Sequence, residues 1–323
     1  PVIEDHDLAV DIGEWVIDTA LTQLESWRSA GLNIPVSVNV SARQLQQSDF
    51  VTRVHAILAV HPGIRSGDLK IEVLETSALE DLSRMSQVIE ECREFGINFS
   101  LDDFGTGYSS LTYLKRLAVS ELKIDQSFVR DMLDDPEDLA ILEGVIGLAT
   151  AFRREVIAEG VETIELGGML LQLGCELAQG YGIARPMPAD QMPDWAMTWK
   201  APESWTNCSK VNYEDRPILY ARVEHRAWLK TLIGYLDGHY VTPPQLDHQQ
   251  CRFGVLMDKM QQDGPVSLSR FKHIDPLHRQ VHGLAAELCE LSASGHREIA
   301  MARKDELLFL RDKLIDKLNQ MLA

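Results

Sequence analysis

SLDDFGTGYSSL, residues 100–111, places two adjacent aspartates and a glycine-rich turn directly after a run of β-forming residues. The run INFSLDD, residues 97–103, is short and largely apolar, which predicts a strand ending at Asp102 and Asp103. Neighbouring carboxylates repel each other unless cations or extra protons are bound beside them. This stretch therefore predicts a strand that carries acidic groups to a chemical site.

Similar runs recur on both sides of this strand, separated by helical stretches. Residues 8–30 have the periodicity of an amphipathic helix, which we expect to end at Gly31. Strands are predicted at residues 35–41, 69–75, 97–103, 121–124, 155–160 and 175–180. Repeated β-α order favours a parallel α/β fold, either a closed (β/α) barrel or an open doubly wound sheet. No GxGxxG motif or P-loop favours the open sheet.

The charge balance limits the partners that the chain can bind. The 323 residues include 31 Lys and Arg against 49 Asp and Glu, for a net charge of −18 at pH 7. Proteins that bind nucleic acid need basic surfaces, so we expect no direct binding of DNA or RNA. An anionic substrate would be repelled unless metal ions lay between it and the protein.

Cysteine usage and apolar content bear on the location of the protein. The five cysteines form no CxxC pair, which indicates reduced thiols rather than a disulfide framework. No segment approaches the roughly 20 apolar residues of a membrane span, and the first residues lack the order of a signal peptide. We therefore expect a cytoplasmic location, with any membrane tether of a longer parent lying in upstream segments.

Polar groups follow each of the six predicted strands. They are Asn39, Glu72, Glu75, Asp102, Asp103, Lys123, Asp125, Glu159, Glu162 and Gln179. Any one of them, taken alone, is most simply a solvated loop residue. In a barrel, however, the carboxyl ends of the strands converge on one face, where active sites are built. Carboxylate and amide oxygens suit Mg²⁺ or Mn²⁺, and two such ions can activate water against a phosphodiester.

These motifs, in this order and spacing, resemble the EAL family of cyclic-di-GMP phosphodiesterases over roughly residues 1–195. The matching segments are SVNVSARQL (37–45), IEVLET (71–76), DDFGTGYSSL (102–111), YLKRL (113–117), ELKIDQSFV (121–129), IAEGVET (157–163) and AQGYGIARPMP (178–188). Leu74 stands where Thr or a similar residue is usual in the family. The resemblance implies a modified TIM barrel that hydrolyses cyclic di-GMP to linear pGpG by a two-metal mechanism.

The resemblance also implies a role for each matching position. Asn39, Glu72 and Asp102 would bind one ion, while Asp102, Asp103 and Glu159 would bind the second. Lys123 would lie beside the attacking water, Glu162 and Gln179 would orient the metal ligands, and Asp125 would contact substrate. Glu75 would anchor the loop at residues 104–110, which in this family couples the active site to a dimer contact. We therefore expect a homodimer.

The chain departs from the family at its start. The Glu-Ala-Leu signature is absent, and six strands are predicted where a barrel needs eight. We expect the natural protein to extend upstream, where sensory or cyclase domains often precede such barrels, and we expect the printed chain to be an impaired catalyst. Two alternatives remain open: a receptor that binds cyclic di-GMP without cleaving it, and a barrel glycosidase using paired carboxylates.

A second, helical region follows a Pro-rich and polar stretch. We predict a linker at residues 196–217, a helical domain at 218–290 and an amphipathic C-terminal helix at 291–323. His278 and His282 stand four residues apart, so both face one side of the expected helix. His239, His248, His273 and His296 are interpreted as surface or helix-cap residues. The sequence therefore predicts an all-α bundle after the barrel.

HRAW (225–228), CRFG (251–254) and HRQVH (278–282) resemble the chemoreceptor zinc-binding, or CZB, family over about residues 218–290. Val255 replaces a Trp that is common there. The resemblance implies zinc bound by His225, Cys251, His278 and His282. The alternative for Cys251 is a small buried apolar residue. Four such ligands make a closed structural or sensory site rather than a catalytic one, and we expect zinc to regulate the barrel.

Overall fold

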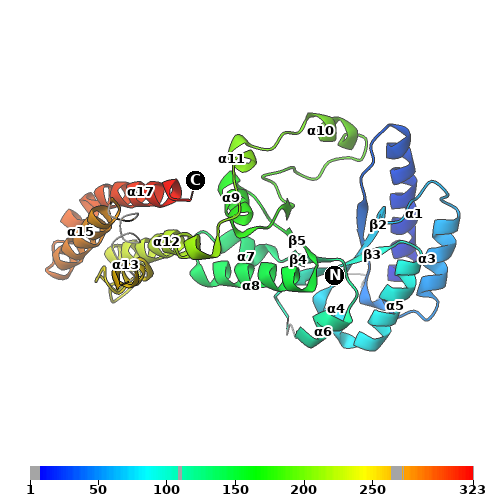
Figure 1. The fold of residues 1–323 in the computed structure, drawn as a ribbon, viewed down its shortest axis with the longest axis horizontal. Helices are drawn as coiled ribbons and strands as arrows, with labels where there is room; N and C mark the ends of the chain where they lie inside the picture. Colours follow the sequence, from blue (N-terminus) through cyan, green and yellow to red (C-terminus); the bar gives the residue numbers. More distant parts are fainter. Residues whose placement is uncertain (1–7, 108–110, 263–270, 272, 323) are drawn as a thin grey trace. The chain divides into compact units, whose positions relative to one another are not determined.

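The computed structural model describes residues 8–107, 111–262, 271 and 273–322 (Figure 1). Contacts along the chain divide it into two compact units. The first comprises residues 1–130, 141–171 and 175–207, and the second comprises residues 131–140, 172–174 and 208–323. No helix in the described ranges combines the length and the apolar character that a membrane crossing requires. The expected domain bounds at 195, 217 and 290 stay predictions.

The first unit contains one parallel sheet, whose strands follow the order of the chain. Each expected strand is present, although the last covers only two residues. The strands are β1 (Val36–Asn39), β2 (Leu69–Leu74), β3 (Asn98–Phe104), β4 (Glu121–Ile124), β5 (Glu155–Ala158) and β6 (Leu177–Ala178). The sheet curls as an incomplete (β/α) barrel (Figure 1). The expectation of an α/β fold with a modified barrel is therefore confirmed.

Helices connect the strands, as parallel pairing requires. Before residue 208 they are α1 (Leu8–Ser29), α2 (Ala42–Leu45), α3 (Phe50–Ala59), α4 (Glu75–Glu80), α5 (Leu82–Glu94), α6 (Leu111–Arg116), α7 (Gln126–Asp131), α8 (Pro136–Phe152), α9 (Ile164–Leu173), α10 (Met192–Thr198) and α11 (Glu203–Thr206). The first matches the predicted helix at 8–30: Ile17, Leu21 and Leu24 form its buried stripe. It ends before Gly31, whose φ of 89° is left-handed.

Successive side chains along each strand point alternately to the outer, apolar face of the sheet and to its inner face. In β2, Leu69, Ile71 and Val73 are almost fully buried, while Lys70 and Glu72 point to the opposite face. Lys70 bonds Glu121 near the amino ends of β2 and β4, and Glu72 bonds Lys123 two residues further along. The two pairs therefore form successive layers, and the second lies toward the carboxyl ends, where barrels build their active sites.

His61 joins the loop after α3 to helix α1. Its Nδ1 lies 3.1 Å from Glu25 Oε2 and its Nε2 lies 3.0 Å from Asp18 Oδ1, both on α1. Burial lowers the pKa of His61, but the hydrogen bonds with the two carboxylates outweigh burial and raise the pKa above its ordinary value. The protonated imidazole therefore holds two carboxylates of α1 at once.

The stabilising effect of His61 should be greatest in mild acid. A raised folded-state pKa adds stability that is fully present below the unfolded pKa, about 6.5, and is lost as pH rises through the folded value. NMR titration should give His61 a pKa above the ordinary histidine value of about 6.5. Glu25→Gln should lower the His61 pKa and weaken the loss of stability above neutral pH. An unchanged pKa in Glu25→Gln would contradict this.

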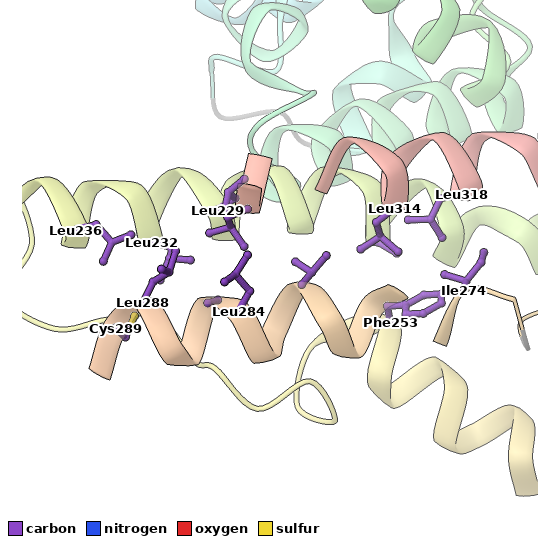
Figure 2. Packing of buried hydrophobic residues seen from close by; sticks show 14 of the residues in the cluster. Leu229, Leu232, Leu236, Phe253, Ile274, Leu284, Leu288, Cys289, Leu314 and Leu318 are labelled. Atoms are coloured by element: carbon purple, nitrogen blue, oxygen red, sulfur yellow. The ribbon is translucent and has the colours of Figure 1, made fainter. Parts of the chain in front are cut away.

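The second unit is a helical bundle, as expected. Its elements from residue 208 onward are η1 (Tyr213–Asp215), α12 (Arg216–Asp237), α13 (Arg252–Gln262), α15 (Asp275–Ala293), α16 (Arg297–Ala302) and α17 (Lys304–Gln320). Figure 2 shows leucines of α12, α15 and α17 meeting between the helices, among them Leu229, Leu284 and Leu314. This apolar cluster gives the bundle its own core, because the helical stripes face one another.

The expected C-terminal helix is two helices rather than one. Arg303, with φ −102° and ψ 9°, separates α16 from α17. The break lets both helices contact α15. Ala300 of α16 and Leu307 of α17 are fully buried. Arg303 also bonds Glu306 and Glu287, which holds the junction. The prediction of one continuous helix was wrong because tertiary packing on α15 overrides the helical periodicity of the sequence.

The expected linker, residues 196–217, contains short elements of its own. Helix α11 carries Trp205, whose indole N–H donates to the Ile164 carbonyl at 2.8 Å. The same ring covers Gly167, where an added Cβ would lie only 2.2 Å from a ring carbon. A glycine is therefore needed at residue 167 for Trp205 to pack on α9, and the first part of the segment contacts the barrel unit.

Candidate active site and candidate zinc site

A local irregularity in β3 brings the adjacent aspartates together. Leu101 pairs with Leu122, but the next pair is Phe104 with Ile124, so β3 carries one extra residue. Asp103 has a φ of 55°, a left-handed conformation that Asp tolerates better than most residues. A regular strand would point the two side chains to opposite faces. Instead, oxygens of Asp102, Asp103 and Glu159 lie within 4.8 Å of one another.

Lys123 lies at the centre of the acidic residues. Its Nζ donates to Glu72 Oε2 at 2.6 Å and to Asp102 Oδ1 at 2.9 Å, and it lies 2.6 Å from Glu159 Oε1. Burial disfavours the charged form, but the hydrogen bonds that Lys123 donates to these carboxylates outweigh burial and raise the Lys123 pKa. The side chain is only 4% exposed. Lys123 is therefore a fixed ammonium and has no lone pair for use as a general base.

The surrounding carboxylates are crowded. Burial raises the pKa of Glu159, although Lys123 opposes the rise, and burial together with Asp102 and Asp125 raises the pKa of Asp103. The pKa of Asp125 is instead lowered: burial opposes this, but the Ser127 hydroxyl and N–H outweigh burial. A bound cation would stabilise the ionised forms of these crowded carboxylates. An all-oxygen donor set fits Mg²⁺ or Mn²⁺.

Glu162 and Gln179 lie on the wall of a pocket of about 590 Å³, together with Glu159. Gln179 Nε2 donates to Glu159 Oε1 at 2.7 Å, which fixes one oxygen of that carboxylate. The adjacent Gly180 is required by close packing, because an added Cβ would lie 2.3 Å from the Val161 nitrogen. Through Glu159, the pocket therefore borders the acidic cluster.

The same pocket reveals a candidate that sequence reasoning did not single out. Arg185 lines it, with its guanidinium 4.5 Å from the ring centre of Tyr181. Trp195 also lines the wall. Arginine is suited to phosphate because its donors form a planar fork. Arg185 belongs to the segment AQGYGIARPMP (178–188), one of the segments that resemble the EAL family. The periodicity of the sequence, however, gave no reason to place Arg185 beside Glu159.

Asn39 is near the cluster but on a different part of the wall. It pairs in register with Glu72, and both line a second pocket of about 380 Å³ with Gly13 and Ile12 of α1. Asn39 itself is exposed. Glu72 therefore links this pocket to Lys123. The other proposed ligands, Asp102, Asp103 and Glu159, lie closer to one another.

Glu75 holds the turn that follows β3. It is fully buried, and its carboxylate accepts from the Gly105 N–H at 2.9 Å and from the Tyr113 hydroxyl at 2.7 Å. The anchoring contact expected for Glu75 is thus formed with residue 105, while residues 108–110 of that loop lie outside the described residues.

Glu75→Ala should destabilise the barrel unit substantially. The change removes the carboxylate that accepts from the Gly105 N–H and from the Tyr113 hydroxyl, and each lost hydrogen bond of this kind costs roughly 1–3 kcal/mol. Tyr113→Phe is the matched variant, because it deletes only one of the two hydrogen bonds and should cost clearly less. Urea unfolding followed by circular dichroism measures both. Equal stability of Glu75→Ala and the unmodified chain would exclude an anchoring role.

The four predicted zinc ligands come together in the helical unit. His225 lies on α12, Cys251 directly precedes α13, and His278 and His282 lie on α15. One ligand atom from each lies within 4.8 Å of all the others, and His278 Nε2 is 3.1 Å from Cys251 Sγ. The three imidazoles are at most 3% exposed. Three helical segments therefore converge on one buried point.

Hydrogen bonds orient these side chains. His225 Nδ1 is 2.6 Å from the Ala221 carbonyl, and His282 Nδ1 is 3.0 Å from the Leu246 carbonyl. The Nε2 atoms of both residues are buried and have no hydrogen-bond partner among the described residues. An unpaired buried nitrogen is costly, whereas a metal ligand carries its lone pair at this position. The residues present fit a zinc ion.

The protonation states agree with metal binding. Burial lowers the pKa of His225 to about 4 and that of His278 to about 2, and it also lowers the pKa of His282. Burial raises the pKa of the Cys251 thiol. At neutral pH the imidazoles are therefore unprotonated and ready to bind, while a metal ion must displace the thiol proton.

One histidine interpreted as a surface residue lies beside this cluster. The His248 ring centre is 6.0 Å from that of His278 and 6.5 Å from that of His282. His248 is half-buried, with its side chain 30% exposed and its Nε2 buried, because the loop before α13 folds back over α15. His239, His273 and His296 are exposed, as expected, and His296 immediately precedes α16.

Comparisons with known proteins agree with this geometry. Residues 1–186 match the EAL domain family, and residues 225–289 match the chemoreceptor zinc-binding domain family. The chain is 40% identical over 193 residues to the bifunctional diguanylate cyclase/cyclic di-GMP phosphodiesterase MucR of Pseudomonas aeruginosa, covering 59% of this chain and 28% of MucR. It is 35% identical over 192 residues to the cyclic di-GMP phosphodiesterase PdeR of Escherichia coli, covering 59% of this chain and 29% of PdeR.

Solved structures give the same result. The phosphodiesterase PaMucR in complex with c-di-GMP aligns with a TM-score of 0.57 at 40% identity, covering 59% of this chain and 78% of that one. The EAL domain of Mycobacterium smegmatis DcpA aligns with a TM-score of 0.58 at 37% identity, covering 61% and 88%. The chain spans less than a third of the length of MucR and PdeR. It belongs to the EAL domain family, and a chemoreceptor zinc-binding domain follows its EAL domain.

Proposed function

We propose that the barrel of this chain hydrolyses one phosphodiester bond of cyclic di-GMP to give linear pGpG, using two Mg²⁺ or Mn²⁺ ions. The observation that carries the proposal is the convergence of Glu72, Asp102, Asp103 and Glu159 around Lys123. MucR and PdeR, which are similar over the same region, are named as cyclic di-GMP phosphodiesterases. Paired carboxylates of a glycosidase would give no role to the buried ammonium.

Each side chain has a distinct task in this proposal. Asn39, Glu72, Asp102, Asp103 and Glu159 would hold the ions, which lower the pKa of bound water and neutralise phosphate charge. Lys123 supplies fixed positive charge where hydroxide develops, because its raised pKa keeps it protonated. Gln179 keeps Glu159 in position through its hydrogen bond. Glu162 would orient ligands from the pocket wall, and Asp125 would contact substrate.

A binding protein without hydrolysis is the second candidate. Lys123 already engages three of the proposed ligands, so an ion must compete with an ammonium for the same oxygens. The printed sequence also lacks the Glu-Ala-Leu signature. We therefore propose that the chain as printed is a weaker catalyst than a form that carries the signature.

We further propose that zinc bound by the helical unit regulates the barrel. Zinc binding itself is supported by the buried nitrogens of His225 and His282, which have no hydrogen-bond partner among the described residues and lie beside Cys251. Four protein ligands close the site, which is typical of structural or sensory zinc. The homodimer, the upstream domains and the cytoplasmic location stay predictions.

Product analysis tests the proposed activity. The chain, with and without a supplied Glu-Ala-Leu segment, is incubated with cyclic di-GMP and Mn²⁺, and products are separated by chromatography. We expect linear pGpG, no product in EDTA, and faster turnover with the segment. Binding of cyclic di-GMP by calorimetry without any product would establish the receptor instead. A zinc chelator of high affinity, added in parallel, shows whether turnover depends on zinc.

A further inference from the structure

His248 stands three residues before Cys251, outside the set of four proposed zinc ligands. The ring centres of the three ligand histidines are separated by 4.7–5.7 Å. The His248 ring is only slightly further away, at 6.0 Å from His278 and 6.5 Å from His282. Its Nε2 is buried and has no hydrogen-bond partner among the described residues. A fifth lone pair is thus available at the edge of the cluster.

The backbone around His248 is held in place. The Leu246 carbonyl contacts His282 Nδ1, and the Trp228 indole N–H donates to the Gln245 carbonyl at 2.7 Å. The thiol of Cys251 donates to the His248 carbonyl at 3.2 Å. Because the main chain is held on both sides, the imidazole would approach the ligands through a change of side-chain rotamer.

The neighbour of His248 favours the correct tautomer. Asp247 Oδ1 lies 3.8 Å from His248 Nδ1. This distance is too long for a hydrogen bond, but the negative charge on that side of the ring favours a proton on Nδ1 and leaves the lone pair on Nε2. The side chain of His248 is 30% exposed, so it has room to move that the three buried ligands lack.

We propose that His248 is a reserve zinc ligand that binds the ion when Cys251 does not. In the exchange, the Cys251 thiolate leaves zinc and takes up one proton, while neutral His248 Nε2 donates its lone pair to the ion. No electron is transferred, and the site becomes more positive by one charge. The inference rests on the zinc site proposed above. Its consequence is that the Cys251 thiol can be released without loss of zinc.

A double-mutant cycle tests this inference on the full chain. The variants are Cys251→Ala, His248→Ala and the double variant, with zinc affinity measured by competition against a chromophoric chelator. We expect His248→Ala alone to change affinity less than about threefold, and to lower it by roughly 10–100-fold in the Cys251→Ala background. His239→Ala, an exposed histidine before the same loop, is the matched control and should have no effect in either background.

Cobalt spectra provide a readout of the ligands themselves. Unmodified protein loaded with Co²⁺ should show a thiolate charge-transfer band, which Cys251→Ala should lose while keeping strong tetrahedral bands. Those bands should weaken in the double variant only. Equal effects of His248→Ala in the two backgrounds, or cobalt spectra of the Cys251→Ala protein that His248→Ala leaves unchanged, would overturn the inference. Failure of the unmodified chain to bind Zn²⁺ would instead overturn the zinc site itself. Cys251→Ser repeats the cycle if the alanine variant does not fold.

Discussion

Lys123→Met is expected to reduce cyclic di-GMP hydrolysis by about 10²–10³-fold, because it removes a preorganised positive charge from the reaction site. The ammonium contacts Glu72, Asp102 and Glu159, so its loss leaves three carboxylates facing one another. Removing one partner of a buried ion pair costs about 3–5 kcal/mol in stability. Mn²⁺ should restore part of that stability, since a cation takes over the lost charge, but it should not restore the rate.

Lys70→Met is the matched control for this variant. Lys70 and Lys123 lie on the same inner face of the barrel, and Lys70 bonds the buried Glu121 near the amino ends of the strands. The control removes the same charge from a buried pair but leaves the carboxyl-end residues intact, so it should destabilise the chain with little change in rate. Initial rates and thermal unfolding with and without Mn²⁺ measure both effects. A similar loss of rate in the two variants would show that Lys123 acts through stability alone.

Zinc is expected to stabilise the helical unit strongly, and His278→Ala/His282→Ala is expected to abolish this effect. At free zinc 1,000-fold above the dissociation constant, binding adds about 4 kcal/mol to the free energy of unfolding. The double variant retains His225 on α12 and Cys251 before α13, but it removes both ligands on α15. His225 and Cys251, even with His248 as a third ligand, leave a tetrahedral site of four protein ligands incomplete.

Elemental analysis and thermal unfolding with and without Zn²⁺ measure this prediction. His239→Ala/His273→Ala is the control, because both residues are exposed and the changes remove two imidazoles of the same kind. It should keep stoichiometric zinc and the full stabilisation. Zinc retained by His278→Ala/His282→Ala at the stoichiometry of the unmodified chain would show that the ion binds elsewhere.

The zinc site should also release protons when it forms. Burial raises the pKa of the Cys251 thiol, so the metal-free site holds that proton at neutral pH. Zinc affinity should therefore fall as pH decreases, since protons compete for the sulfur. Calorimetry in buffers of different ionisation enthalpy measures the number of protons released, and a value of zero would contradict thiolate binding.

Local patterns in the sequence predicted the six strands, the first helix, the polar groups at the strand ends and the pair His278 and His282, whereas the full sets of metal ligands followed from the resemblance to the EAL and CZB families. Each of the local predictions depends on short-range information: an apolar run bounded by turns, a helical period, or two histidines four residues apart. The position of the strands in chain order also gave the site, because parallel strands bring their carboxyl ends to one edge. This is why Asp102 and Glu159 could be grouped although 57 positions separate them in the chain.

The rest depended on contacts that no local pattern contains. The left-handed φ of Asp103 follows from the pairing of β3 with β4, and the break at Arg303 follows from packing on α15. The burial of His248 Nε2 follows from a loop that folds over the same helix. Sequence determined which residue types were available and at which strand ends they stand. Only the tertiary structure decided that one ammonium meets three carboxylates, because charge pairing in a barrel interior depends on distances between strands that separate parts of the chain bring together.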